Sequence, residues 1–398
     1  MDRLVIKTIL LLLILPLHFT NVSGQGNTSL INDKVDWKSF LSRHDLVWEK
    51  TPYNYYTAPF LGNGLLGAMF YCPDGENIRL DIGRSDVVEH RDTDDLNVVD
   101  NGRLPIGHFK LTMDHEFDKA VGRLDLFNAE ANFEISAFRD KKANIRTLVF
   151  KEYDAILVEL ESPDDLQFRW MFYPDVSIVP GCDYALTRKH FNPFPEMSNI
   201  DGINICVQER DAGGSYTTAW KVIESSDKVT RLLITVQDSY PGHESVEKAV
   251  ENIKQLSLPG KIEEQISAHR KWWNNFYTKS FISVPHEKME SVYWINQYKF
   301  GSMMRENAPV PGNMGPWYKT MRYPGIWWNM DTQSLYSSLH ISNQLELAST
   351  LSDYIIKMND ALIASVPEKY RYNSAALCRA TGPALQGRLT WPGKEFPE

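Results

Sequence analysis

The sequence predicts a multidomain β-then-α protein, in which an N-terminal antiparallel β-sandwich is followed by a helical linker and a helical domain. Between about residues 60 and 240, apolar residues recur at every second position, which is the period of a half-buried strand. Beyond that stretch they recur at every third or fourth position, the period of an amphipathic helix. Many strands without intervening helices favour a sandwich or barrel over a parallel α/β sheet.

The N-terminus has the three parts of a secretory signal. A charged start is followed by the apolar run ILLLLILPL and then by the small residues Ser23 and Gly24, which is the usual order of a cleavable leader. Residues 1–24 are therefore expected to be removed, so that the mature protein is secreted or periplasmic. The apolar run is shorter than the roughly 20 residues that span a bilayer, and no membrane insertion of the mature protein is expected.

Residues 25–243 are assigned to the β-sandwich domain. Phe133, Ile135 and Ala137 alternate with other residues, and the alternation resumes at Ile145 and Val149 after the polar stretch RDKKAN. Two alternating runs joined by a polar turn predict a β-hairpin. The same alternation predicts further strands at 109–113, 155–160, 168–173 and 231–236.

Residues 244–284 are predicted to form a linker of two helices. The segment 245–256 and the segment from Ile262 to Tyr277 both carry apolar residues at helical spacing. Trp272 and Trp273 lie on or beside the apolar stripe of the second helix, so we expect them to pack between domains rather than bind a ligand.

Residues 285–398 are predicted to form a helical domain. Asn343 followed three residues later by Glu346 has the spacing of a capping box, which predicts a helix start. An earlier helix, ahead of the Pro/Gly-rich loop that ends at Gly325, is predicted from one apolar stripe: Met289, Val292, Tyr293, Phe300 and Met303.

The segment YPGIWWNMDTQSLYSSL, residues 323–339, combines two tryptophans with closely spaced polar residues. On an extended backbone Asn329, Asp331 and Gln333 would project to the same side. The flat surfaces of Trp327 and Trp328 beside these donors and acceptors suit a sugar ring, which has hydroxyls and an apolar face. The alternative is that Asn329 or Asp331 caps the helix that follows.

Charge and cysteine content exclude several classes of protein. The chain of 398 residues has a formal charge of −9, and removing the leader, with one Asp and two basic residues, makes it −10; nucleic acid calls for a positive surface. The cysteines Cys72, Cys182, Cys206 and Cys378 are widely scattered and have no metal-ligand spacing. No metal site, cofactor or nucleic-acid partner is expected.

Three stretches point to one family. They are PFLGNGLLGAMFY at 59–71, HRKWWNNFYTKSFISVP at 269–285 and NMDTQSLY at 329–336. Together they resemble family-95 glycoside hydrolases, the inverting α-L-fucosidases and α-L-galactosidases. The first stretch is similar to that family's signature near the start of its β domain, and the second to its junction with the barrel. NMDTQSLY at 329–336 resembles the family's Asn-x-Asn-x-Gln segment, whose asparagines help the catalytic Asp to activate water. The resemblance implies that residues 285–398 begin an (α/α)6 barrel and that the partner is an oligosaccharide or polysaccharide.

The resemblance also implies roles for residues of this chain. Asn329 matches the first asparagine of the motif and Gln333 its glutamine, whereas Asp331 stands where the family has the second asparagine and could itself be a base. We therefore expect Asn329 and Asp331 to be catalytic, and Trp327, Trp328, Gln333 and Asn63 to bind substrate. The family's general acid lies farther beyond this motif than residue 398, so a partial barrel without the acid is expected.

Two other functions remain open. The LGNG stretch also occurs in family-65 hydrolases and phosphorylases of α-glucosides, which share the architecture and in which phosphate can replace water. A non-catalytic β-sandwich that binds glycans is the alternative from a different class. Around Asn63, flanked by Gly62 and Gly64, a tight turn with positive φ is the simpler interpretation than a ligand cradle.

The leader yields the first prediction. Mass spectrometry of the protein recovered from outside the cytoplasm should find a new N-terminus near Gln25, because signal peptidases cut after small residues that follow an apolar run. An intact Met1 on the exported protein would show that the segment is not a cleaved signal.

Overall fold

The computed structural model describes residues 34–91, 102–162, 166–178, 191–226, 228–319, 325–378 and 380–383. The leader at 1–24, Cys182 and residues 92–101 lie outside the described residues. Among the residues described, no helix is long and apolar enough to cross a membrane.

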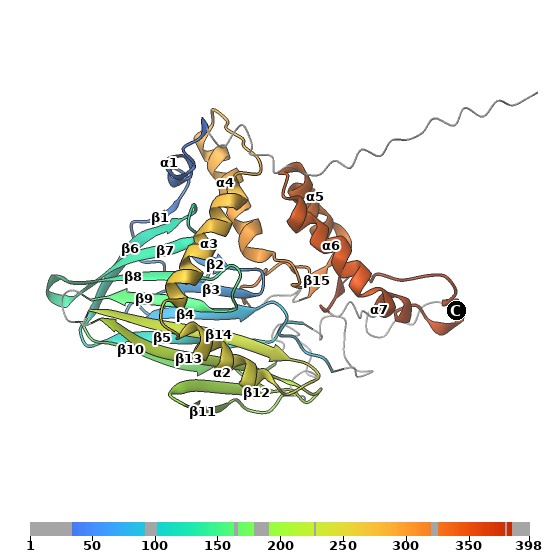
Figure 1. The fold of residues 1–398 in the computed structure, drawn as a ribbon, viewed down its shortest axis with the longest axis horizontal. Helices are drawn as coiled ribbons and strands as arrows, with labels where there is room; N and C mark the ends of the chain where they lie inside the picture. The colour runs from blue at the N-terminus through green and yellow to red at the C-terminus, as the bar shows by residue number, and fades with distance from the viewer. Residues whose placement is uncertain are drawn as a thin grey trace, which may run out of the picture.

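Two antiparallel sheets form the N-terminal part, as predicted (Figure 1). Their facing sides share one core, in which Phe70 of one sheet lies 5.2 Å from Phe133 of the other between ring centroids. The strands of the larger sheet, in spatial order, are β1 (Leu46–Trp48), β6 (Phe117–Asp125), β7 (Glu130–Ala137), β8 (Lys141–Val149), β9 (Ile156–Glu161), β14 (Val229–Ser239), β13 (Ser215–Ser226), β12 (Ile203–Glu209) and β11 (Glu196–Ile200). Those of the smaller sheet are β10 (Phe168–Pro174), β5 (Gly107–Met113), β4 (Ile78–Arg84), β3 (Leu66–Tyr71) and β2 (Phe60–Gly62).

The hydrophobic alternation located these strands correctly. The predicted hairpin is β7–β8, where Phe133 pairs with Ile145 in antiparallel register. Both side chains are buried, since successive residues of a strand face opposite sides and these two face the core. The runs at 109–113, 155–160, 168–173 and 231–236 correspond to β5, β9, β10 and β14.

Two linker helices follow the sandwich, α2 (Ser245–Leu256) and α3 (Lys261–Tyr277), with the short α1 (Trp37–Ser42) at the start of the described chain. The apolar side of α2, with Ala249 and Ile253, packs on the outer face of the large sheet. Trp273 of α3 is fully buried, and its ring stacks on Tyr298 of the next helix at 5.1 Å between centroids. The prediction that this tryptophan packs between parts of the chain is confirmed.

The predicted apolar stripe of α4 (Glu287–Met303) is wrong in part. Met289 and Val292 are 61% and 54% exposed, whereas Glu290 is buried. The Glu290 carboxylate accepts a hydrogen bond from the Val284 N–H at 3.0 Å and lies 3.2 Å from Nε2 of His44. With Glu290 facing inward, Met289 and Val292 face outward, whereas Met303 is buried in the core and Tyr293 and Phe300 pack against it, as the stripe predicts.

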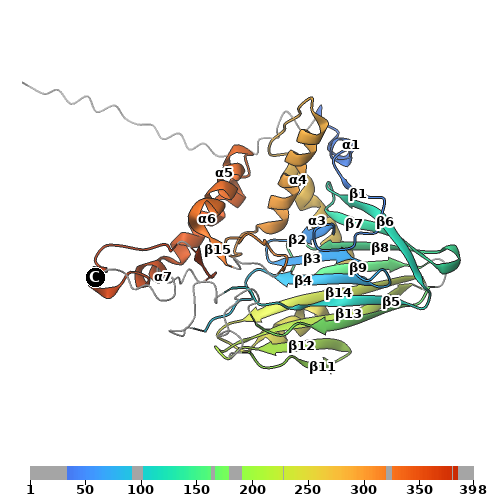
Figure 2. The same cartoon turned by 180° about the vertical axis from the view of Figure 1, so that it is seen from behind.

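The chain ends its described part in a pair of short strands, β15 (Ile326–Trp327) and β16 (Ala380–Thr381), and three helices, α5 (Gln333–Ile341), α6 (Leu345–Lys357) and α7 (Asn359–Ala364). Short 3-10 turns lie at Phe138–Asp140 and Glu368–Tyr370. The three helices lie together to one side of the sandwich (Figures 1 and 2). Within the described residues α4 to α7 form no closed barrel, so the barrel stays a prediction.

The predicted capping box before α6 is not formed. Gln344, not Asn343, precedes the first turn, and it makes no capping hydrogen bond through its side chain. Asn343 instead has a φ of 58° and donates a hydrogen bond to the Lys279 carbonyl at 2.7 Å, while Glu346 forms an ion pair with Lys279. Both side chains therefore bind α6 to the end of the linker.

Backbone contacts join the sandwich to the segment that follows α4. A Cβ added to Gly67 would lie 2.7 Å from the carbonyl carbon of Pro316, and one on Gly64, whose φ is +95°, 2.6 Å from Cβ of Arg305. Only glycine permits this approach and this φ without strain. The signature stretch at 59–71 is thus a packing surface for the residues beyond α4.

Two buried basic side chains complete this junction. The Lys151 amino group donates to the carbonyls of Gly301 and Met304, and the Arg103 guanidinium donates to those of Gly315, Pro316 and Trp317. Burial holds the pKa of Lys151 well below its usual range and lowers that of Arg103 to about 10.

The adjacent tryptophans of α3 give a prediction about stability. Trp273→Ala should lower the free energy of unfolding by about 3–5 kcal/mol, because a fully buried ring leaves a cavity. Trp272→Ala is the matched control, since Trp272 is half-buried and its loss should cost only about 1–2 kcal/mol. Urea unfolding followed by circular dichroism measures both. Equal losses would contradict the assignment of Trp273 as the packing residue.

His269 gives a prediction about pH. Nδ1 accepts a hydrogen bond from the Lys151 backbone N–H at 3.1 Å, Nε2 lies 2.9 Å from the Asn128 carbonyl, and burial lowers the pKa of His269 to about 3. In the unfolded chain this histidine is protonated below about pH 6.5, whereas in the folded chain it stays neutral down to a much lower pH. The contribution of the buried His269 to the free energy of unfolding is thus complete above about pH 6.5. It is lost as pH falls, by about 2 kcal/mol at pH 5.

His269→Gln should flatten this dependence, since an amide can donate and accept but does not titrate. The control is His243→Gln, because the His243 side chain is exposed. Urea unfolding between pH 5 and pH 8 tests the difference, and parallel pH profiles for wild type and His269→Gln would refute it.

Candidate functional site

The two tryptophans of the 323–339 segment differ in environment. Trp328 is buried in the core, and its indole N–H donates to the Thr381 hydroxyl at 2.9 Å. Trp327 is half-buried and pairs through its backbone with Ala380 in the β15–β16 ladder. Trp328 therefore anchors the segment, and Trp327 is the one whose ring is partly open to a ligand.

The backbone turns sharply after Trp328, so the extended segment predicted for 329–333 is wrong. Met330 has a φ of 70°, and its N–H donates to the Gln333 side-chain oxygen at 3.1 Å. A side-chain acceptor held by α5 thus stabilises the turn in place of an extended backbone. Asn329, Asp331 and Gln333 are all exposed. We refer to residues 328–333 as the Asp331 turn.

The turn excludes the helix-capping interpretation of its polar residues. Thr332 is the residue that precedes α5, and no side chain caps the helix there. Asp331 instead accepts a hydrogen bond from the side-chain amide of Asn313 at 2.8 Å. Asn313 lies in the loop after α4, where a Cβ on Gly312 would come within 2.6 Å of the Gly325 carbonyl. Two loops therefore meet at an exposed carboxylate.

This arrangement suits carbohydrate chemistry. The Asp331 carboxylate can accept hydrogen bonds or a proton, and the amides of Asn313 and Asn329 each offer a donor and an acceptor. All three are exposed on one pair of loops. They can bind sugar hydroxyls or orient a water molecule.

Asn63 is placed differently from the other predicted binding residues. It is fully buried, and its amide donates to the carbonyls of Phe150 and Tyr153 at 2.9 and 3.2 Å. Its side-chain oxygen accepts from the N–H groups of Leu65 and Leu66. The structure thus gives Asn63 the role of holding a tight turn, with Gly64 in the left-handed region.

Two other acidic residues of this part of the chain differ in their contacts, since within the described chain only Glu346 has a side-chain partner and Glu368 is exposed without one. Glu346 is paired with Lys279, and Glu368 begins the 3-10 turn Glu368–Tyr370. Among the residues that the structure describes, no group of three or more His, Cys, Asp or Glu side chains could hold a metal ion.

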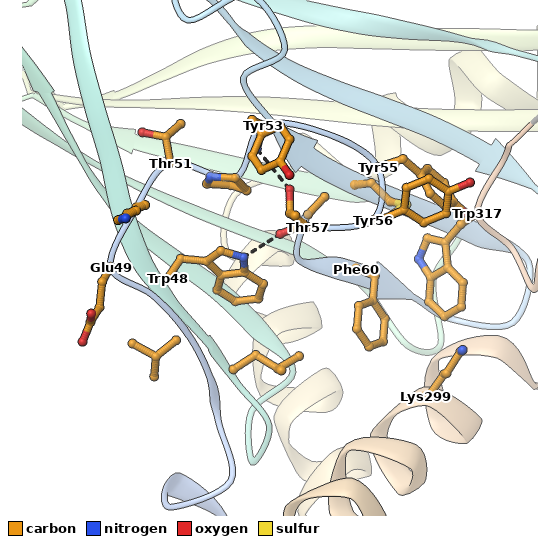
Figure 3. Close-up of a pocket in the computed structure, with 16 residues that line it drawn as sticks. Trp48, Glu49, Thr51, Tyr53, Tyr55, Tyr56, Thr57, Phe60, Lys299 and Trp317 are labelled. Atoms are coloured by element: carbon orange, nitrogen blue, oxygen red, sulfur yellow. Dashed lines mark hydrogen bonds between the residues drawn. The ribbon is translucent and has the colours of Figure 1, made fainter.

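A second site was not anticipated from the sequence. An open pocket of about 890 Å³ lies between β1, the loop after it, β2 and α4 (Figure 3). The signal that could have found it is the run YNYY at 53–56, which crowds three tyrosines into one turn. We call it the tyrosine pocket, and its aromatic lining residues are Trp48, Tyr53, Tyr55, Tyr56, Phe60 and Trp317.

Comparison with known proteins supports the fold. No family model and no curated protein matches the sequence. Among solved structures, the chain is similar to one described as "Putative kojibiose phosphorylase from human microbiome", with a TM-score of 0.60 and 14% identity. The match covers 83% of this chain and 49% of the other, so this chain spans about half the length of that structure. The chain therefore shares the fold of that structure over the matched part, and none of these comparisons gives specific support for family 95.

Proposed function

We propose that this protein cleaves glycosidic bonds in α-glucosides. The observation that carries the proposal is the similarity in fold, over 83% of the chain, to a structure named as a kojibiose phosphorylase. An exposed Asp331 turn that caps no helix supports it, because such polar residues are then available to a substrate. An α-glucoside replaces the α-L-fucoside or α-L-galactoside first expected, since the structural similarity favours a family-65-type enzyme.

The residues at the turn favour water over phosphate as the attacking group. In inverting hydrolysis the oxygen of a water molecule attacks the anomeric carbon while one carboxylate takes a proton from that water. A carboxylic acid protonates the departing glycosidic oxygen. We assign the first role to Asp331, with Asn329 and Asn313 orienting the water. The role of the acid is assigned to no residue of this chain, because the family resemblance places it beyond residue 398. A carboxylate at this position would repel a phosphate anion. We further propose, from the leader alone, that the reaction takes place outside the cytoplasm.

Assays of the purified protein with kojibiose and maltose, with and without phosphate, test the proposal. Slow glucose release that does not require phosphate is expected, because no general acid is assigned within the chain. Asp331→Asn keeps an acceptor for Asn313 but removes the base, so kcat should fall by about a hundredfold or more with little change in melting temperature. Asp353→Asn, an exposed aspartate on α6, is the control and should behave as wild type.

Other results would overturn the proposal in defined ways. Turnover that requires phosphate would mean phosphorolysis and would remove the role of Asp331 as base. Turnover of an aryl α-L-fucoside or α-L-galactoside alone would restore the family-95 assignment. Glycan binding without turnover of any of these substrates would identify a binding module.

A further inference from the structure

We propose that the tyrosine pocket is a second carbohydrate site, which binds an oligosaccharide chain between the β-sandwich domain and α4, on residues other than those of the Asp331 turn. No residue of that turn lines the pocket. The class of sugar, gluco-oligosaccharides, rests on the proposed function. The existence of a second binding site rests on the pocket itself.

The floor of the pocket is a fixed aromatic surface. The Trp48 indole N–H donates to the Thr57 carbonyl at 2.6 Å, and that of Trp317 donates to the Leu61 carbonyl at 2.8 Å. Phe60 meets Trp317 edge to face, with ring centroids 5.2 Å apart. Because both indoles are held by backbone groups, their rings are positioned before any ligand arrives, and binding would cost little side-chain entropy.

The rim presents aromatic rings to solvent on an ordered turn. Tyr53 and Tyr56 are 63% and 80% exposed. The turn beneath them is held by Asn54, whose side-chain oxygen accepts from the N–H groups of Tyr56 and Thr57 at 2.9 and 3.0 Å. The Thr57 hydroxyl oxygen accepts in turn from the N–H of Tyr53 at 3.1 Å. Exposed aromatic rings held rigidly are characteristic of binding surfaces.

Polar groups accompany the rings. Within the described part of the chain, the hydroxyls of Tyr53, Tyr55 and Tyr56 form no hydrogen bond with another residue. Burial raises the pKa of Tyr55 to about 12, so that its hydroxyl stays protonated and can donate. Lys299 from α4 and Glu49 from the loop also line the pocket (Figure 3).

These features together select a sugar. A pyranose has an apolar face that can lie on a ring and hydroxyls around its edge that need donors and acceptors. The volume, about 890 Å³, falls within the range of roughly 300–1,000 Å³ that is usual for ligand sites. A purely apolar ligand would offer no hydrogen bond to the half-buried Tyr55 hydroxyl.

Isothermal titration of the full chain with maltoheptaose tests the inference. The double variant Tyr53→Ala/Tyr56→Ala should weaken binding by about tenfold or more, because it removes two rings from the rim. Both side chains are exposed, and the variant should therefore fold normally, with an unchanged circular dichroism spectrum. Tyr372→Ala is the matched control, since Tyr372 is 86% exposed and lies outside the pocket; it should bind as wild type.

Asp331→Asn separates this inference from the proposed function. Binding of maltoheptaose that is lost in the double variant and kept in Asp331→Asn supports a second site, even if no turnover is found. Binding that is lost in Asp331→Asn and kept in the double variant would overturn the second site while leaving the proposed function standing. Absence of maltoheptaose binding by the wild-type chain would also overturn the inference.

Discussion

The burial of two basic side chains beneath the segment after α4 is the constraint on which the rest of the structure depends. The last carbonyls of a helix have no partners within the helix, and here the Lys151 amino group takes those of Gly301 and Met304. Arg103 takes three consecutive carbonyls of the loop beyond. Because that loop carries both Asn313 and Trp317, the same contacts position the partner of Asp331 and part of the floor of the tyrosine pocket.

Elements with a clear hydrophobic period could be predicted from the sequence, and those decided by distant polar contacts could not. The helix predicted at 245–256 has the bounds of α2, because its apolar residues meet one continuous sheet face. The buried face of α4 was missed because it depends on Glu290 and on His44, more than two hundred residues earlier in the chain. The local pattern predicts a helix cap at Asn343, because the hydrogen bond from Asn343 to the Lys279 carbonyl joins residues far apart in the sequence.

The candidate site shows the same division. The composition of the 327–333 stretch predicts a candidate site. It does not predict which of its residues hold the backbone and which stay exposed. Trp328 and Gln333 hold the backbone, and Asn329 and Asp331 are left exposed. The pairing of Asp331 with Asn313 spans a Pro/Gly-rich loop, and the tyrosine pocket joins residues near 50 to Lys299 and Trp317. Neither the pairing of Asp331 with Asn313 nor the meeting of distant residues in the pocket leaves a periodic pattern or a motif in the sequence.

The junction also sets an order of events during synthesis. Lys151 binds carbonyls 150 and 153 residues later in the chain, and Arg103 reaches one 214 residues later. While the chain is growing, the sandwich can close long before these acceptors exist, and contacts between such distant residues form slowly. Until they form, two basic groups and a glycine-lined backbone surface stay open to water. The nascent sandwich is therefore at its most vulnerable to proteases and to wrong partners in the interval before the loop after α4 has been made.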